Sequence, residues 1–268
     1  MSDPNQLAND GCASQSKACR GGKEKAAKAY RTIRRGDDDP PGGGHGEADQ
    51  GRRMNAKRNP WLWVPSIYIA EGIPYMIVMT VSVVMYKNLG LSNTDIALYT
   101  SWLYLPWVIK PLWSPFVDLF RTKRFWIIAM QLAIGGALAC VALTLPATAF
   151  VRYTLAMFWI MAFSSATHDI AADGFYMLGL STPEQAAFVG VRTVFYRVAT
   201  IASKGGLVIL AGTLNEHGYP PASAWSVTFV VVGAFFLALC LYHFFVLPFP
   251  EADRGAPLDK GRGLVTEY

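Results

Sequence analysis

The chain has 268 residues, of which 52% are hydrophobic and only 16% are charged. Soluble domains carry closer to a quarter charged residues, so this composition disfavours a soluble protein and indicates an integral membrane protein. The formal net charge is +5, and half of the 24 Lys and Arg residues lie in the first 60 positions. The rest of the chain is therefore very poor in charge.

Residues 1–57 form the first predicted region, a disordered N-terminal extension that is basic and rich in Gly. It includes DDDPPGGGHGE at Asp37–Glu47 and almost no large apolar residue. Such a segment cannot bury enough surface to offset its chain entropy. Because both signs of charge are mixed in it, we expect no nucleic-acid partner. Met54 stands just before the first apolar run, and we interpret it as the natural start of the protein.

Six apolar runs follow, each near the ~20 residues that a membrane-spanning helix needs. They are Trp61–Tyr86, Asp95–Leu112, Phe125–Leu145, Tyr153–Leu178, Ala186–Leu214 and Ala224–Leu247. The pattern predicts an all-α integral membrane protein in which residues 58–249 form a bundle of six transmembrane helices. Residues 250–268 are expected to begin a cytoplasmic loop.

Basic residues predict the orientation of this bundle, because loops rich in Lys and Arg stay in the cytoplasm. Three segments that share one side of a six-span protein carry most of them: Arg52, Arg53, Lys57 and Arg58, then Arg121, Lys123 and Arg124, then Arg254, Lys260 and Arg262. The opposite connectors contain only Lys87 and Arg152 as basic groups. Both termini are therefore expected in the cytoplasm.

Cysteines give no sign of a cofactor. Cys12 and Cys19 lie in the polar extension, whereas Cys140 and Cys240 lie inside apolar runs. None has metal-ligand spacing or a neighbouring His. We expect neither a metal site nor a bound cofactor.

Ionisable residues inside the predicted spans are the candidate functional groups. Counting 1.5 Å per residue places Glu71 and His168 near the bilayer midplane, with Asp169 beside them. Charged groups at that depth are expensive and usually mark a substrate or proton path. We therefore predict that Glu71, His168 and Asp169 contact the solute or carry protons.

The fourth and fifth spans are predicted to form an antiparallel hairpin around Thr182–Pro183. Residues at equal depth would then pair Asp173 with Arg192 and Asp169 with Arg197. These four residues are predicted to form an acid–base ladder. The alternative is that the ladder only locks the two helices together.

Four stretches of the chain resemble the sequences of a known family of membrane transporters. They are YIAEGIPYMIVMTVSVVMYKNLGLSNTDIA, WLYLPWVIKPLWSPFVDLFRTKRFW, SSATHDIAADGFYM and GVRTVFYRVA. In these stretches the chain resembles the N-terminal half of a major facilitator superfamily transporter, and more narrowly the AmpG-type muropeptide permeases. His168 stands where those permeases typically have Gln.

The turn SPFVDLFRTKR (Ser114–Arg124) resembles the superfamily's Gly-x-x-x-Asp-Arg motif. Ser114 stands in place of the glycine, and Leu119 in place of the basic residue. The resemblance implies a cytoplasmic gate made by the four charged residues of this turn: Asp118, Arg121, Lys123 and Arg124.

The resemblance also implies the activity. A secondary active transporter of this kind imports anhydro-muropeptides or related amino-sugar compounds by proton symport across a bacterial inner membrane. Its partners are the lipid bilayer, the small-molecule solute and protons. Tyr75 and Tyr196 would stack on a sugar, or else are core residues. Because the family has twelve helices, we expect this chain to be a truncated product or one part of a split transporter that lacks its C-terminal six-helix half.

Three alternatives remain open. The chain is a carrier of another solute, such as acetyl-CoA or a sugar derivative. It is a non-transporting fragment. It is a membrane acyltransferase that uses His168 and Asp173, which match the pattern His-x-x-x-x-Asp. We favour a transporter and no enzymatic activity.

Overall fold

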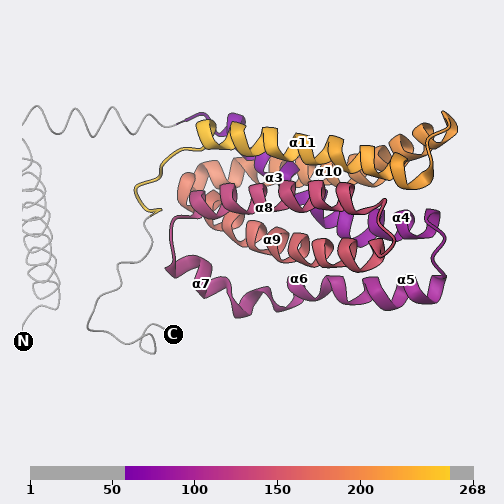
Figure 1. The fold of residues 1–268 in the computed structure, drawn as a ribbon. Coiled ribbons are helices and arrows are strands. Elements are labelled where there is room, and N and C mark those ends of the chain that lie inside the picture. Colours follow the sequence, from indigo (N-terminus) through magenta and orange to yellow (C-terminus); the bar gives the residue numbers. More distant parts are fainter. Residues whose placement is uncertain (1–57, 254–268) are drawn as a thin grey trace, which may run out of the picture. The chain divides into compact units, whose positions relative to one another are not determined.

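A computed structural model describes residues 58–253, and the regular structure in that range is entirely helical (Figure 1). This confirms the all-α class. The predicted extension over residues 1–57, with Met54, lies outside the described residues. So does most of the predicted cytoplasmic loop over residues 250–268.

The first predicted span is one helical rod over Pro60–Asn88. It consists of α3 (Pro60–Met76), a wide π-helical turn (Ile77–Val81) and α4 (Ser82–Asn88). The wide turn follows Pro74, which lacks a backbone N–H and so cannot support regular α-helical hydrogen bonding. The change of helix type therefore begins two residues after Tyr75 and six after Glu71.

The second predicted span is helical but broken. Its pieces are α5 (Asn93–Thr100), a 3₁₀ turn (Ser101–Tyr104), α6 (Leu105–Ile109), a 3₁₀ turn (Lys110–Leu112) and α7 (Ser114–Leu119). Pro106, Pro111 and Pro115 each stand near the start of a new piece, where the missing N–H costs least. The expectation of one continuous helix over Asp95–Leu112 is therefore wrong.

The remaining four predicted spans are single helices within a few residues of their predicted bounds. They are α8 (Lys123–Thr144), α9 (Phe150–Gly179), α10 (Thr182–Glu216) and α11 (Pro221–Val246). In the described range, four rods are long and apolar enough to cross a membrane, namely Pro60–Asn88, α8, α10 and α11. The charge-bearing α9 and the broken segment are not among them, so six spans remain a prediction.

Packing places α3 between α9 and α10. The most extensive helix contacts join α8 to α9, α8 to α11 and α3 to α10, followed by α3 to α9 and α10 to α11, whereas α9 and α10 make few contacts with each other. A two-residue turn connects α9 to α10, as the predicted hairpin requires, but α3 contacts each of these helices more than they contact each other. Ser181 and Glu184 close that turn with a capping box at the start of α10.

Candidate functional site

A cavity of about 260 Å³ lies between α3, α9, α10 and the broken segment. Charged and aromatic side chains line it: Glu71, Tyr75, Tyr104, Trp107, Lys110, Ser165, Asp169 and Tyr196. Four of the five residues predicted to form the solute and proton pathway therefore line one cavity. The fifth, His168, does not.

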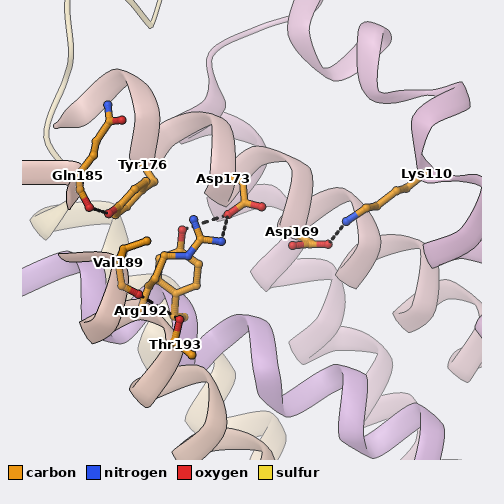
Figure 2. Close-up of polar contacts among 9 residues, drawn as sticks. Lys110, Asp169, Asp173, Tyr176, Gln185, Val189, Arg192 and Thr193 are labelled. Carbon is orange, nitrogen blue, oxygen red and sulfur yellow. Dashed lines mark hydrogen bonds and ion pairs between the residues drawn. The ribbon is translucent and has the colours of Figure 1, made fainter. Parts of the chain in front are cut away.

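Lys110 and Asp169 form an ion pair at the wall of this cavity. The Lys110 Nζ lies 2.6 Å from the Asp169 Oδ2, as Figure 2 shows. The predicted partner of Asp169 was Arg197, and that pairing is wrong. Arg197 is exposed on α10, and no ion pair to it is found among residues 58–253. Equal depth brings two residues together only where their helices are neighbours, and α3 separates these two.

Glu71 adds a second carboxyl next to Asp169. Its Oε2 atom is buried and has no hydrogen-bond partner among the described residues. The neighbouring Gly72 allows α3 and α10 to approach, because a Cβ there would lie 2.9 Å from the Tyr196 carbonyl oxygen. This close approach fixes Tyr196 beside Glu71.

Aromatic rings form another wall of the cavity. The Tyr75 and Trp107 ring centroids are 5.2 Å apart with an interplanar angle of 89°, and Tyr104 stacks on Trp107 at 6.4 Å. Such edge-to-face and stacked contacts hold the rings in fixed orientations. The cavity therefore offers flat apolar faces beside its charges.

Asp173 and Arg192 form a second ion pair one helical turn further along α9. The Arg192 Nη2 lies 2.9 Å from the Asp173 Oδ1, and Figure 2 shows the two ion pairs along the same helix. The Tyr68 hydroxyl also donates to Asp173 at 3.1 Å, and the guanidinium lies over the Tyr68 and Tyr176 rings. The structure thus contains this predicted pair of the ladder, joined by contacts from α3.

His168 faces away from the cavity, toward α8. It is fully buried, and its Nε2 lies 3.0 Å from the Nε2 of Gln131. The Gln131 Oε1 lies 2.9 Å from the His243 Nδ1, and the His243 Nε2 lies 2.9 Å from the Ser66 Oγ. These four residues, the His168 chain, connect α9, α8, α11 and α3. The expectation that His168 joins Glu71 and Asp169 in one site is therefore wrong.

The acyltransferase alternative has no matching geometry. His168 points toward α8 and Asp173 toward Arg192. The described residues therefore do not bring His168 and Asp173 into one site.

The turn between α7 and α8 gathers the predicted gate residues. Lys123 forms an ion pair with Asp118, and Arg121 adopts a positive φ of 67°. Beyond α11, the Asp253 carboxylate accepts from the backbone N–H groups of Lys123 and Arg124 at 2.6 and 3.1 Å. The chain after α11 is thus fastened to the start of α8. A gating role for this turn remains a prediction.

Four important residues were missed by sequence reasoning. They are Lys110, Gln131, His243 and Asp253. Lys110 and His243 gave a signal, since each is a basic side chain within an apolar run. Gln131 and Asp253 gave a weaker one, because a single polar residue has many possible roles.

Fold and site together define a multi-pass membrane protein with a charged, aromatic-lined cavity between its helices. Residues 71–247 match the model of the BT1 family, and the chain belongs to this family. The resemblance to muropeptide permeases is confirmed by an anhydromuropeptide permease of Escherichia coli (strain K12). That protein is 28% identical over 152 residues, which cover 52% of this chain and 29% of the permease.

Other relatives come from eukaryotes. An uncharacterised protein of Schizosaccharomyces pombe is 27% identical over 196 residues, or 61% of this chain and 37% of that protein. A probable folate-biopterin transporter of Arabidopsis thaliana is 28% identical over 133 residues, or 43% of this chain and 26% of that protein. The matched part of the chain therefore covers only 26% to 37% of the length of these three relatives.

Proposed function

We propose that the chain forms the solute-binding half of a secondary active membrane transporter, with both termini in the cytoplasm. The observation that carries this proposal is the cavity, in which Glu71 on a rod long and apolar enough to cross a membrane meets Asp169 and Lys110. Ionisable residues in such a setting are costly and serve solute or ion pathways. Membership of the BT1 family, with a permease and a probable transporter among the relatives, supports the same function.

Proton coupling is the second element of the proposal, with Glu71 as the proton carrier. The Glu71 Oε2 is buried without a hydrogen-bond partner among residues 58–253, and Asp169 is next to it. Two adjacent carboxylates repel each other, and an unpaired buried charge is strongly disfavoured. A proton on Glu71 removes both costs, and loss of that proton to one side of the membrane would couple transport to a gradient.

The proposed solute is an amino-sugar compound of the anhydro-muropeptide class, in a bacterial inner membrane. The name of the E. coli relative supports this, and the Tyr75–Trp107 wall offers faces on which a sugar ring can stack. A pterin such as folate is the second candidate, because the same wall suits a flat ring and an Arabidopsis relative carries that name.

A second six-helix bundle is also part of the proposal. Large apolar side chains of α10 are exposed along its length, among them Val189, Val198, Ile201 and Ile209. This apolar surface supports contact with lipid or with a partner bundle, the C-terminal half expected from the resemblance.

Binding and uptake by the 268-residue chain in vesicles test the proposal. We expect labelled N-acetylmuramic acid to bind, with proton exchange on binding that Glu71→Gln abolishes and Glu216→Gln, an exposed control, leaves intact. An imposed proton gradient should drive uptake, either by the wild-type chain alone or once a second six-helix bundle is supplied. Absence of binding by both the amino sugar and folate would overturn the proposed function, and binding without proton exchange would overturn the coupling.

A further inference from the structure

Lys110 is the one basic side chain among the described residues that line the cavity. Its ammonium has three N–H donors, and the contact with Asp169 uses one of them. The Lys110 side chain is 38% exposed, whereas its Asp169 partner is 16% exposed. Lys110 therefore presents unused hydrogen-bond donors to the cavity.

The backbone around Lys110 is suited to a change of partner. Lys110 opens a three-residue 3₁₀ turn that Pro111 continues, between the short helices α6 and α7. This segment packs mainly on α9 and exposes Val108 and Leu112. A flexible four-carbon stem on so short a turn can move its ammonium without rebuilding a long helix.

Charge balance then couples Lys110 to protonation. The cavity contains two carboxyls, Glu71 and Asp169, and one ammonium. An anionic solute is repelled while both carboxyls are charged. Once the proton carried by Glu71 passes to Asp169, however, the ammonium lacks its counter-ion in an apolar setting, where an unpaired charge is costly. An anionic group on the solute can then take the place of Asp169.

We propose that Lys110 is the anion-recognition residue of the cavity, and that the solute carries a carboxylate that replaces Asp169 on its ammonium. This inference rests on the proposed function only in taking the cavity as the solute site. It adds the chemical class of the solute and the residue that selects it. Transfer of the Glu71 proton to Asp169 and binding of the solute carboxylate are then linked events, after which Glu71 takes up a new proton.

Two matched pairs of labelled probes test the inference on the full chain in vesicles. N-Acetylmuramic acid is N-acetylglucosamine with an added lactyl carboxylate, and folate is paired with its diamide, in which both carboxylates are replaced by neutral amides. The wild-type chain should bind the carboxylated member of at least one pair roughly tenfold or more tightly, as a charge-assisted hydrogen bond allows. Lys110→Gln should abolish that preference without weakening the neutral member, and Lys110→Arg should keep most of it.

Control variants distinguish failure of the Lys110 role from failure of the proposed amino-sugar solute. Lys87→Gln removes an exposed lysine whose Nζ donates to Asn93, and it should leave the preference unchanged. Asp169→Asn should tighten binding of the carboxylated probe, because it frees Lys110. A preference seen only in the folate pair would remove the amino-sugar proposal and support the role of Lys110. Equal binding of both members, equal loss of both in Lys110→Gln, or no binding of any probe would overturn the role of Lys110.

Discussion

The Arg192 Nη2 lies 2.9 Å from the Asp173 Oδ1, and the same guanidinium lies 4.7 Å from the centre of the Tyr68 ring. Because Tyr68 belongs to α3, this ion pair joins three helices rather than two. It does so near the turn between α9 and α10, where the Tyr176 hydroxyl also donates to the Gln185 backbone carbonyl. The pair therefore fixes the end of the bundle at which α3, α9 and α10 meet.

Removing this pair should destabilise the chain measurably. Asp173→Asn and Arg192→Gln should each lower the free energy of unfolding by about 1–2 kcal/mol, since both side chains are only partly buried. The double variant should show a coupling energy of about 1 kcal/mol, because each change removes the same contact. Unfolding in mixed detergent micelles would measure all three values.

Arg197→Gln is the matched control for this comparison of single and double variants. Arg197 is on the same helix but is exposed. Its loss should change the free energy of unfolding by less than about 0.5 kcal/mol. A loss as large as that of Arg192→Gln, or zero coupling between Asp173 and Arg192, would contradict the assigned pairing.

The His168 chain should behave as one unit. Gln131→Leu removes the amide that contacts both His168 and His243, leaving two buried imidazoles without these partners. We expect a loss of roughly 1–3 kcal/mol in the free energy of unfolding. His243→Leu should cost a similar amount, whereas His217→Leu, at the exposed end of α10, should cost little. Equal effects of the two His→Leu variants would argue against a structural role for the chain.

His168→Gln should be mild, because a glutamine amide can still hydrogen-bond to Gln131. His168→Leu cannot, and it should be destabilising by about 1–2 kcal/mol. The same comparison bears on function, since an acyltransferase would lose its base in both variants. Solute binding retained in His168→Gln would support the carrier, whereas complete loss of binding with an intact fold would place His168 in the site after all.

Much of the fold could be predicted because membrane-length apolar runs and their breakers are local signals. The ends of α8, α9, α10 and α11 follow from charge and turn residues at each boundary. The three prolines of the second apolar run indicate its breaks, but a hydropathy profile alone does not detect the loss of a backbone N–H. Which helices become neighbours depends on packing over long sequence distances, and no local pattern encodes it.

Some residues of the candidate site could be predicted from the sequence, and others could not. Glu71 and Asp169 were recognisable because a carboxyl is rare in an apolar run. Lys110 gave an ambiguous signal, since a lysine near the end of a predicted span equally suggests a side chain that reaches the membrane surface. His168 and Asp169 are adjacent in sequence, yet successive residues on a helix point about 100° apart. One therefore faces α8 and the other faces the cavity.

Asp253 should stabilise the start of α8. Its carboxylate accepts from two backbone N–H groups there, where the helix dipole also favours a negative charge. Asp253→Ala should lower the free energy of unfolding by about 1 kcal/mol. Asp253→Asn keeps an acceptor oxygen and should lose less. Faster hydrogen exchange at Lys123 and Arg124 in Asp253→Ala would locate the effect, and unchanged exchange would contradict the cap.

Gly72 should tolerate no larger side chain. A Cβ at this position would lie 2.9 Å from the Tyr196 carbonyl oxygen and 3.1 Å from the Ala199 Cβ, so α3 and α10 would have to separate. Gly72→Ala should therefore cost about 1–3 kcal/mol through overpacking, measured by unfolding in detergent.

The matched control is Gly136→Ala on α8, where a Cβ would meet nothing within 4 Å. That change should be neutral or stabilising by up to about 1 kcal/mol, because Ala favours a helix over Gly. Since Glu71 and Tyr196 lie on the two helices that separate, Gly72→Ala should also weaken solute binding, whereas Gly136→Ala should not. Equal stability and equal binding in the two variants would show that α3 and α10 are not held together at Gly72.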